Sequence, residues 1–367
     1  MKVPYLDLNH QNLPLKNELL IAAASVINSS WYILGSKVEQ FEKEYAEFSK
    51  VRYCKGVANG LDAIILALKS LNIGPGDEVI VPSNTYIATW LAVSYVGAQP
   101  IPVEPRIGTY NINPDLIEAK INTRTKAIIP VHLYGQCCEM EAIMNIANRF
   151  NLAVIEDNAQ SQGAMYKQEV TGSFGKINAT SFYPGKNIGA LGDGGALTSN
   201  DEALMHQVGV LRNYGSERKY FNEVQGVNSR LDEIQAAFLS IKLPMVNRWN
   251  MERVALAKRY QEQLRGVGDL ILPTVAQYAT HVYHVYMIRT ARRDNLQEYL
   301  RTHEIGTLIH YPVPPHLQKA YQSLNFKAGD FPLAEIIAKT CLSLPLYPGL
   351  KEAEVDFVCD TIKKFFS

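Results

Sequence analysis

An alternation of short apolar runs and longer amphipathic segments, between about residues 50 and 240, constrains the fold most strongly. The short runs are nearly continuous in hydrophobicity, which is typical of strands that are covered on both faces. Helical stretches separate most of them, at Thr85–Tyr95, Pro114–Ile121 and Met140–Arg149. This order predicts an α/β fold with a large, mostly parallel sheet wrapped by helices. The apolar runs are Glu78–Pro82, Pro100–Glu104, Ala127–His132, Ala153–Asp157, Ala179–Tyr183 and Gly195–Ser199.

The last third of the chain predicts a smaller α+β domain. Residues 230–265 form a long helical stretch that Pro244 bends or breaks. Residues 1–30 are expected to form an arm followed by a helix. We therefore place the arm and the large domain over residues 1–245 and the small domain over residues 246–367. Within the small domain we expect a strand at His281–Arg289 and helices at Leu296–His303 and Glu352–Phe366.

Composition excludes several classes of function. Acidic and basic residues balance at 36 each, so the net charge of the chain does not attract nucleic acid. None of the five cysteines forms a C-x-x-C pair, and no Cys/His group has zinc spacing. No segment is apolar enough to span a membrane, and the first residues lack the apolar segment of a secretory signal. We expect a cytoplasmic protein with reduced thiols, no metal, and no membrane or nucleic-acid partner.

Two charged residues follow apolar runs, at the sheet edge where open α/β sheets bind ligands. Asp157 closes one run, and a buried carboxylate there needs a partner. That partner is either a structural cap or ion pair, or the protonated ring nitrogen of a cofactor. Lys186 follows another run and precedes a glycine-rich stretch. Such a lysine is either solvated or serves as a nucleophile or phosphate ligand.

Two further segments at this edge also leave two interpretations open. Asn59–Asp62 opens an apolar helix whose free N–H groups either bind an anion or are simply capped by Asn59. Tyr86 either packs or covers a planar ring. Nucleotide-binding fingerprints fail, because Asn187 replaces the Ser or Thr of a P-loop and the glycines near Gly192 do not complete G-x-G-x-x-G. A plain nucleotide-binding oxidoreductase is therefore set aside.

Nine motifs occur in a fixed order along essentially the whole chain. They are Trp31-Tyr-Ile-Leu-Gly35, Asn59-Gly-Leu-Asp62, Gly76-Asp-Glu-Val-Ile-Val-Pro82, Val131-His-Leu-Tyr-Gly-Gln136, Glu156-Asp157, Ser181-Phe-Tyr-Pro-Gly-Lys186, Gly192-Asp-Gly-Gly195, Asn228-Ser-Arg-Leu-Asp-Glu233 and His310-Tyr-Pro312. Their order and spacing resemble the DegT/DnrJ/EryC1/StrS family of sugar aminotransferases. The resemblance implies the aspartate-aminotransferase fold, PLP fold type I, with a seven-stranded type of sheet and a smaller C-terminal α+β domain.

The same resemblance implies pyridoxal 5'-phosphate (PLP) as the cofactor. Lys186 would form the Schiff base with PLP and later move protons, for which its amine must be neutral and its pKa depressed. Asp157 would pair with the protonated pyridine nitrogen that makes PLP an electron sink. Some members carry His at the lysine position and remove a hydroxyl instead, and Lys186 argues against that reaction.

Further cofactor contacts follow from the resemblance. Gln160 would hydrogen-bond the ring hydroxyl, and Tyr86 would stack on the ring face. Asn228 would reach the phosphate in the neighbouring subunit, which implies a homodimer with shared active sites. Within one chain, the phosphate would be held by Gly60, Leu61 and Ser181.

The resemblance also implies the substrates. L-Glutamate would give its amino group and leave as 2-oxoglutarate, and a nucleotide-linked keto sugar would accept the amine. Asn59–Asp62 and Ser83–Tyr86 are more similar to members that convert a dTDP-3-oxo-6-deoxyhexose into a dTDP-3-amino-3,6-dideoxyhexose than to the 4-oxo group. Candidate contacts to sugar or diphosphate, for which packing is an equal alternative, are Tyr183, Arg212, Tyr214, His310 and Tyr311.

Other functions within this fold stay open. One is a 4-aminotransferase for a UDP- or dTDP-4-oxo sugar, or an aminotransferase for a cyclitol ketone. Another is a PLP-fold regulator without turnover, although the resemblance leaves no room for an added DNA-binding domain. Asn158 and Gln162 replace the Ala and His that many members carry, which raises the question of an altered pocket wall.

Overall fold

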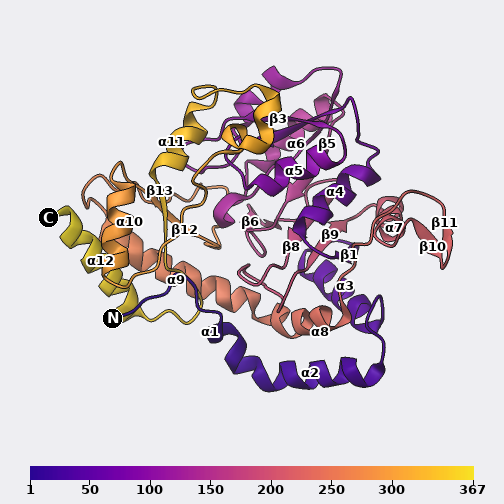
Figure 1. The fold of residues 1–367 in the computed structure, drawn as a ribbon, viewed down its shortest axis with the longest axis horizontal. Coiled ribbons are helices and arrows are strands. Elements are labelled where there is room, and N and C mark those ends of the chain that lie inside the picture. Colours follow the sequence, from indigo (N-terminus) through magenta and orange to yellow (C-terminus); the bar gives the residue numbers. More distant parts are fainter.

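A seven-stranded sheet forms the centre of the protein, which the computed structural model describes over residues 1–367 (Figure 1). The strand order is β1-β9-β8-β5-β4-β2-β3. Neighbouring strands are parallel except around β9, which runs antiparallel to both β1 and β8. The predicted mostly parallel α/β fold is thus confirmed. The strands are β1 (Tyr53–Val57), β2 (Glu78–Pro82), β3 (Gln99–Val103), β4 (Thr125–Ile128), β5 (Ala153–Asp157), β8 (Ile177–Ser181) and β9 (Gly195–Ser199).

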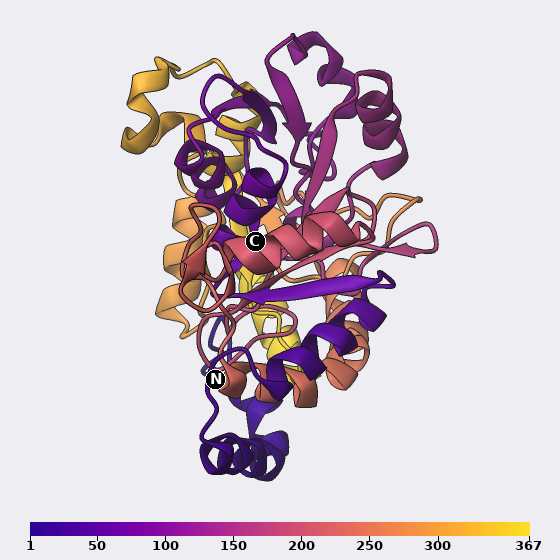
Figure 2. The same cartoon turned by 90° about the vertical axis from the view of Figure 1, so that its right-hand side faces the viewer.

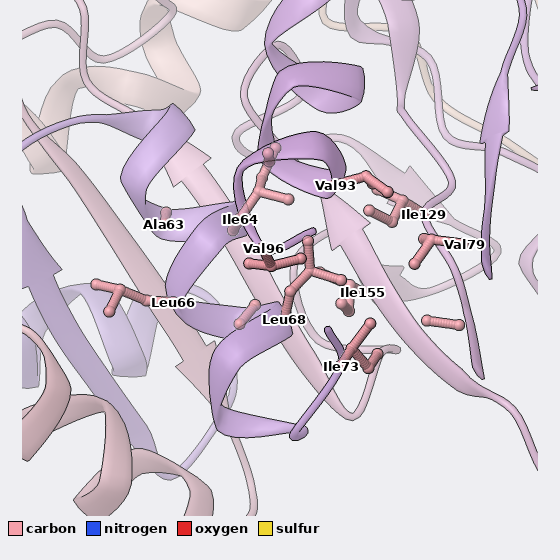
Figure 3. Packing of buried hydrophobic residues seen from close by; sticks show 14 of the residues in the cluster. Ala63, Ile64, Leu66, Leu68, Ile73, Val79, Val93, Val96, Ile129 and Ile155 are labelled. Carbon is pink, nitrogen blue, oxygen red and sulfur yellow. The ribbon is translucent and has the colours of Figure 1, made fainter. Parts of the chain in front are cut away.

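Helices cover both faces of this sheet, because successive residues of a strand point to opposite sides. In β2, Val79 and Val81 join the largest hydrophobic cluster, whereas Ile80 belongs to a cluster on the other face. The largest cluster packs the sheet against α4, α5 and α7, and Figure 3 shows part of it. The opposite face packs against α3, α6 and α8. The bounds are α3 (Ser36–Phe48), α4 (Gly60–Ser70), α5 (Ile87–Tyr95), α6 (Met140–Arg149), α7 (Glu202–Leu211) and α8 (Glu233–Lys242).

The carboxyl ends of the parallel strands meet at one edge, and the predicted functional residues follow them there. Asp157 is the last residue of β5, and it lies beside Ala179 of the neighbouring β8. β8 ends at Ser181, shortly before Lys186, and β2 leads into the segment that contains Tyr86. The topology therefore gathers at one edge side chains that are far apart in the sequence.

A second, smaller group of elements packs around its own hydrophobic core, which contains Leu256, Ile288 and Val358. The 3₁₀ helix η5 (Leu243–Met245) contains Pro244 and separates α8 from α9, as the proline predicted. Val3 of the arm joins this core, and Tyr321 joins the core of the sheet. The elements are α9 (Val246–Leu264), β12 (Tyr286–Arg289), α10 (Arg293–Thr302), α11 (Pro332–Thr340), β13 (Cys341–Leu344) and α12 (Glu352–Phe366). Since most apolar residues of this group pack in a cluster of their own, we keep a domain boundary after residue 245 as a proposal.

The N-terminal arm projects from the body in both views (Figures 1 and 2), and one hairpin projects on the opposite side from the C-terminal end in Figure 1. Helix α2 (Lys16–Ser29) follows the short α1 (Asn9–Asn12) and packs on α8 through Leu15, Leu19 and Phe238. The hairpin comprises β10 (Ser216–Arg218) and β11 (Phe221–Asn222), and a second small hairpin comprises β6 (Met165–Tyr166) and β7 (Glu169–Val170). None of the helices combines the length and the apolar character that crossing a membrane requires.

Two expectations about elements are wrong in detail, and one strand was not expected. The segment Pro114–Ile121 forms only two 3₁₀ helices, η2 (Pro114–Leu116) and η3 (Glu118–Lys120), because an isolated stretch this short pays the nucleation cost of an α-helix for few hydrogen bonds. The predicted strand at His281–Arg289 begins only at Tyr286. Strand β1 was not predicted, because Lys55 and Gly56 interrupt its apolar pattern.

Candidate active site

A cavity of about 840 Å³ opens at the carboxyl edge of the sheet, between the sheet and the C-terminal elements. Its size suits a small-molecule site, which typically measures several hundred cubic ångströms. Ten of the predicted site residues line it: Gly60, Leu61, Tyr86, Asp157, Gln160, Ser181, Tyr183, Lys186, His310 and Tyr311. The predicted residues Arg212, Tyr214 and Asn228 do not line it.

Lys186 lies in a tight turn beyond β8, where its backbone N–H donates to the carbonyl oxygen of Tyr183 at 2.8 Å. Its side chain lines the cavity and forms no ion pair within the chain, so it is not a structural charge. Burial lowers the pKa of Lys186 to about 8, although the negative charge of Asp157 acts in the opposite direction. A substantial fraction of the amine is therefore neutral near physiological pH, as a nucleophile or base requires.

Asp157 is buried, yet it has no cationic partner within salt-bridge distance. One carboxylate oxygen accepts from the hydroxyl of Thr89 at 3.0 Å, and the other accepts from the backbone N–H of Ala159 at 3.2 Å. Burial raises the pKa of Asp157, while these hydrogen bonds and the charge of Lys186 oppose the shift. A structural ion pair is thus excluded, and the oriented carboxylate is available to a cationic group in the cavity.

The neighbouring Glu156 points the other way and is structural. Its carboxylate accepts from the backbone N–H groups of Gly172, Phe174 and Gly175, at 2.8, 2.6 and 3.0 Å, and contacts His132 at 2.8 Å. Because side chains alternate along β5, this network anchors the strand from behind while Asp157 faces the cavity. The Glu-Asp motif therefore combines a structural residue with a functional one.

The start of α4 fits a phosphate group. Asn59 caps the helix, since its side-chain oxygen accepts from the N–H of Asp62 at 2.9 Å. The N–H groups of Gly60 and Leu61 have no acceptor within the helix and line the cavity. A Cβ atom at Gly60 would lie 2.6 Å from the Cβ of Ser181, so glycine brings the backbone against the serine. Both interpretations of this motif therefore hold together: a cap by Asn59, and an anion cradle beside the hydroxyl of Ser181.

Gln160 connects the sheet edge to the loop that carries His310 and Tyr311. Its side-chain oxygen accepts from the backbone N–H of Tyr134 at 2.6 Å, and its amide donates to the Tyr311 hydroxyl at 3.0 Å. The exposed ring of Tyr86 lies 5.1 Å from that of Tyr311, measured between centroids. These aromatic side chains form one wall of the cavity, where a planar ring would be covered.

Arg212 has a structural role, which corrects its prediction as a sugar or diphosphate ligand. Its guanidinium is buried, pairs with the carboxylate of Glu42 and donates to the carbonyl oxygen of Gly56 at 2.6 Å. A charge so deeply paired is not available to a ligand. The sequence could not distinguish the two roles, because Glu42 comes from a distant helix.

Tyr214 and Asn228 lie in the projecting segment around β10 and β11, and both are exposed. Residues 213 and 228 are joined by an antiparallel bridge, and the guanidinium of Arg230 lies 5.4 Å from the ring centroid of Tyr214. Neither side chain reaches the cavity of its own chain. Contact with the cavity of a neighbouring subunit stays a prediction.

Two departures from the family pattern do not touch the cavity. Gln162 is fully buried behind it, where its amide donates to the Thr180 hydroxyl and to the Ser181 carbonyl oxygen, both at 3.0 Å. Asn158 donates to the carbonyl oxygen of Thr171 at 3.3 Å and accepts from Ser161. Both residues therefore support the wall from behind and do not reshape its inner surface.

Several side chains that line the cavity were not among the predicted site residues, and they include Tyr5, Arg253 and His284. The Nδ1 atom of His284 lies 3.2 Å from the side-chain oxygen of Asn187. Arg253 carried one available signal, because it stands on the apolar face of α9 with Leu256 and Tyr260. The sequence gives no signal for Tyr5, because only the folded structure brings the N-terminal arm to the cavity.

These residues fit PLP. A lysine amine of lowered pKa, an oriented carboxylate without a partner, and an N–H cradle beside a serine hydroxyl line one cavity. They would hold the aldehyde carbon, the ring nitrogen and the phosphate of the cofactor, respectively.

Comparisons with known proteins agree with this site. The sequence profile of the DegT/DnrJ/EryC1/StrS aminotransferase family matches residues 14–363. A dTDP-3-amino-3,6-dideoxy-alpha-D-galactopyranose transaminase from Aneurinibacillus thermoaerophilus is 50% identical over 363 residues, 99% of each chain. The erythromycin biosynthesis sensory transduction protein EryC1 of Saccharopolyspora erythraea is 46% identical, also over 99% of each chain.

A solved structure extends the similarity to the fold. The crystal structure of DesV from S. venezuelae in complex with a ketimine intermediate superposes with a TM-score of 0.98 at 45% identity. The superposition covers 100% of this chain and 99% of DesV. Because profile, sequence and structure all match over nearly the whole length, the chain belongs to the DegT/DnrJ/EryC1/StrS aminotransferase family.

Proposed function

We propose that the protein transfers the amino group of L-glutamate to a dTDP-linked 3-oxo-6-deoxyhexose, giving a dTDP-3-amino-3,6-dideoxyhexose. One observation carries the chemistry: Lys186, with its lowered pKa, shares a cavity with the unpaired carboxylate of Asp157. The relative that is 50% identical is a dTDP-3-amino-3,6-dideoxy-alpha-D-galactopyranose transaminase, which supports a 3-amino sugar as the product. PLP is the cofactor of this aminotransferase.

When bound, PLP supplies an electron sink that stabilises a negative charge on the substrate carbon. Asp157 favours the protonated form of the cofactor's ring nitrogen, because a carboxylate stabilises an adjacent positive charge. Thr89 and the N–H of Ala159 fix the orientation of that carboxylate. As a neutral amine, Lys186 would take the proton from the carbon of the donor that carries the amino group. Once protonated, it would return a proton to the adjacent carbon of the cofactor, and it would move protons in the opposite order when the keto sugar accepts the amine.

The sugar is expected at the open side of the cavity, near Tyr183, His310 and Tyr311. Tyr183 is exposed, and His310 is held by a 2.8 Å contact between its Nδ1 and the hydroxyl of Ser343. Burial, and to a lesser extent the charge of Lys186, lowers the pKa of His310 to about 4. A neutral imidazole hydrogen-bonds sugar hydroxyls without adding a charge beside Lys186.

We include a homodimer with shared active sites in the proposal. Helix α2 and the segment after it expose large apolar side chains, which a second copy of the chain would cover. They are Leu20, Ile21, Ile27, Trp31 and Tyr32. Asn228 lies in the projecting segment, exposed and outside its own cavity, as a residue that reaches a neighbour's phosphate must be. A cytoplasmic location, supported by five free cysteines, completes the proposal and is testable by cell fractionation.

The first test is the visible absorption of the purified protein with PLP. Addition of L-glutamate should remove the band of the lysine-bound cofactor, and 2-oxoglutarate should restore it. The glutamate-treated protein is then offered either a 3-oxo or a 4-oxo dTDP sugar. Only the 3-oxo sugar should restore the absorption band. Restoration by the 4-oxo sugar alone would replace the proposal with a 4-aminotransferase. A band that ignores every amino donor and keto sugar would favour a regulator, the role that the name of the EryC1 relative suggests.

A further inference from the structure

Arg253 is a buried cation in the active-site cavity for which the mechanism above has no use. It stands on α9, it is 1% exposed, and it lines the same cavity as Lys186. Burial lowers its pKa to about 10, so the guanidinium keeps its charge at neutral pH. A buried charge is costly unless an opposite charge accompanies it. The question is which anion accompanies Arg253.

The chain itself supplies no such anion, since no carboxylate lies within 4.0 Å of Arg253. Nη1 donates to the carbonyl oxygens of Tyr283 and Leu346, at 3.3 and 3.0 Å. Nε is buried without any hydrogen-bond partner, and Nη2 donates to no group either. One edge of the guanidinium, formed by Nε and Nη2, is thus free.

That free edge is the one with which arginine binds carboxylates in two parallel hydrogen bonds. The same protein shows this twice. On α9, Nε and Nη2 of Arg259 donate to the two carboxylate oxygens of Asp356 at 2.6 and 2.7 Å. On α10, Nε and Nη2 of Arg301 donate to those of Glu298 at 2.7 and 2.6 Å. Arg253 presents the same fork without a carboxylate.

We propose that Arg253 binds the α-carboxylate of the amino donor through its Nε–Nη2 edge. The inference rests on the proposed function, in which an α-amino acid reacts at Lys186. In such a donor the carboxylate is attached to the carbon that carries the amine, so it must bind close to the reacting centre. Lys186 and Arg253 both lower the pKa of His284, which places the two cations around the same imidazole.

The other anions in the reaction fit this position less well. The cofactor's phosphate has its own cradle at Gly60 and Ser181. The diphosphate of a nucleotide sugar is bulky and needs an open surface, whereas Arg253 is 1% exposed. Burial keeps His284 and His310 neutral, so Arg253 is the one permanent cation among the side chains that line the cavity. A small carboxylate is the anion that this site suits.

The test compares the two half-reactions in Arg253→Lys and Arg253→Gln. Single-turnover conversion of the PLP form by L-glutamate should require concentrations on the order of 100-fold higher in both variants, because lysine keeps the charge but not the fork. Conversion by the dTDP-3-amino-3,6-dideoxyhexose, which has no carboxylate, should keep its concentration dependence. Arg259→Gln is the matched control, since it removes a fork on the same helix that the protein itself fills, and both half-reactions should be unchanged.

Each other result overturns the assignment. Equal losses in the two half-reactions would make Arg253 structural, and a loss confined to the amino sugar would make it a diphosphate ligand. If the variants converted at the same L-glutamate concentrations as the wild type, Arg253 would not bind the donor. Melting temperature and PLP content identify a misfolded Arg253→Gln, in which case Arg253→Lys decides. If the wild type ignored the amino sugar, the proposed acceptor would fail, while the glutamate titration would still test Arg253. If it ignored L-glutamate, the same variants would be titrated with whichever α-amino acid does convert the cofactor.

Discussion

At the scale of single residues, the chemistry depends on the pKa of Lys186. Burial lowers it to about 8 against the charge of Asp157. In the cofactor-free protein, the rate at which Lys186 reacts with an amine-specific acylating reagent should therefore rise with pH through about 8. The neutral amine is the reactive form, so the rate falls on the acid side. A midpoint near the ordinary lysine value of about 10.5 would show that burial does not tune this amine.

Replacement of Lys186 by Ala should abolish turnover while PLP still binds without a covalent link. Loss of the general acid–base group alone costs about 100- to 10,000-fold. The measurement is transamination at saturating substrate, with PLP content determined separately. Transamination that persists in this variant would assign the proton transfers to another group.

Asp157→Asn tests the partner of the ring nitrogen. Asparagine keeps the size, and its single amide oxygen can accept from either Thr89 or the N–H of Ala159, but it removes the charge that favours a protonated ring. We expect PLP to bind and the rate to fall by about 100-fold or more. Thr89→Val serves as the milder comparison, since it removes only the hydrogen bond that orients the carboxylate. Near-normal rates in Asp157→Asn would exclude the proposed role.

At the scale of elements, the close approach of α4 to β8 builds the phosphate cradle. Gly60→Ala would place a methyl group 2.6 Å from the Cβ of Ser181, so the helix must shift. We expect a loss of about 1–3 kcal/mol in the free energy of unfolding and weaker PLP binding. Gly209→Ala is the control, because its Cβ would be 3.9 Å from the nearest side-chain atom and alanine favours the helix. Denaturant titration and PLP equilibrium binding measure both effects, and a neutral Gly60→Ala would contradict the cradle.

Helices and strands were predicted where the local pattern of apolar residues is clear. The bounds of β5, β9, α6 and α12 were predicted because the two strands are short continuous apolar runs and the two helices have apolar residues at helical spacing. Strand β1 was missed because its own residues show no clear apolar pattern. Its pairing with β9 stabilises it instead. The same distinction between local pattern and distant contacts explains which site residues could be predicted. Asp157 and Lys186 follow local strand ends, whereas the ion pair of Arg212 and the return of Tyr5 depend on contacts between distant segments.

At the scale of the whole molecule, we propose that a second chain completes the active site, since Asn228 is exposed and lies outside its own cavity. Mixed dimers of Lys186→Ala and Asn228→Ala subunits test this. If Asn228 serves the neighbour, a mixed dimer has one site with both changes and one with neither. The intact site should then give about half the wild-type activity per dimer. If Asn228 acts within its own chain, every site in the mixed dimer carries one change, and activity should stay near that of the Asn228→Ala homodimer or below. Native mass spectrometry of differently tagged subunits confirms the mixed species, and a monomeric protein with full activity would refute the shared site altogether.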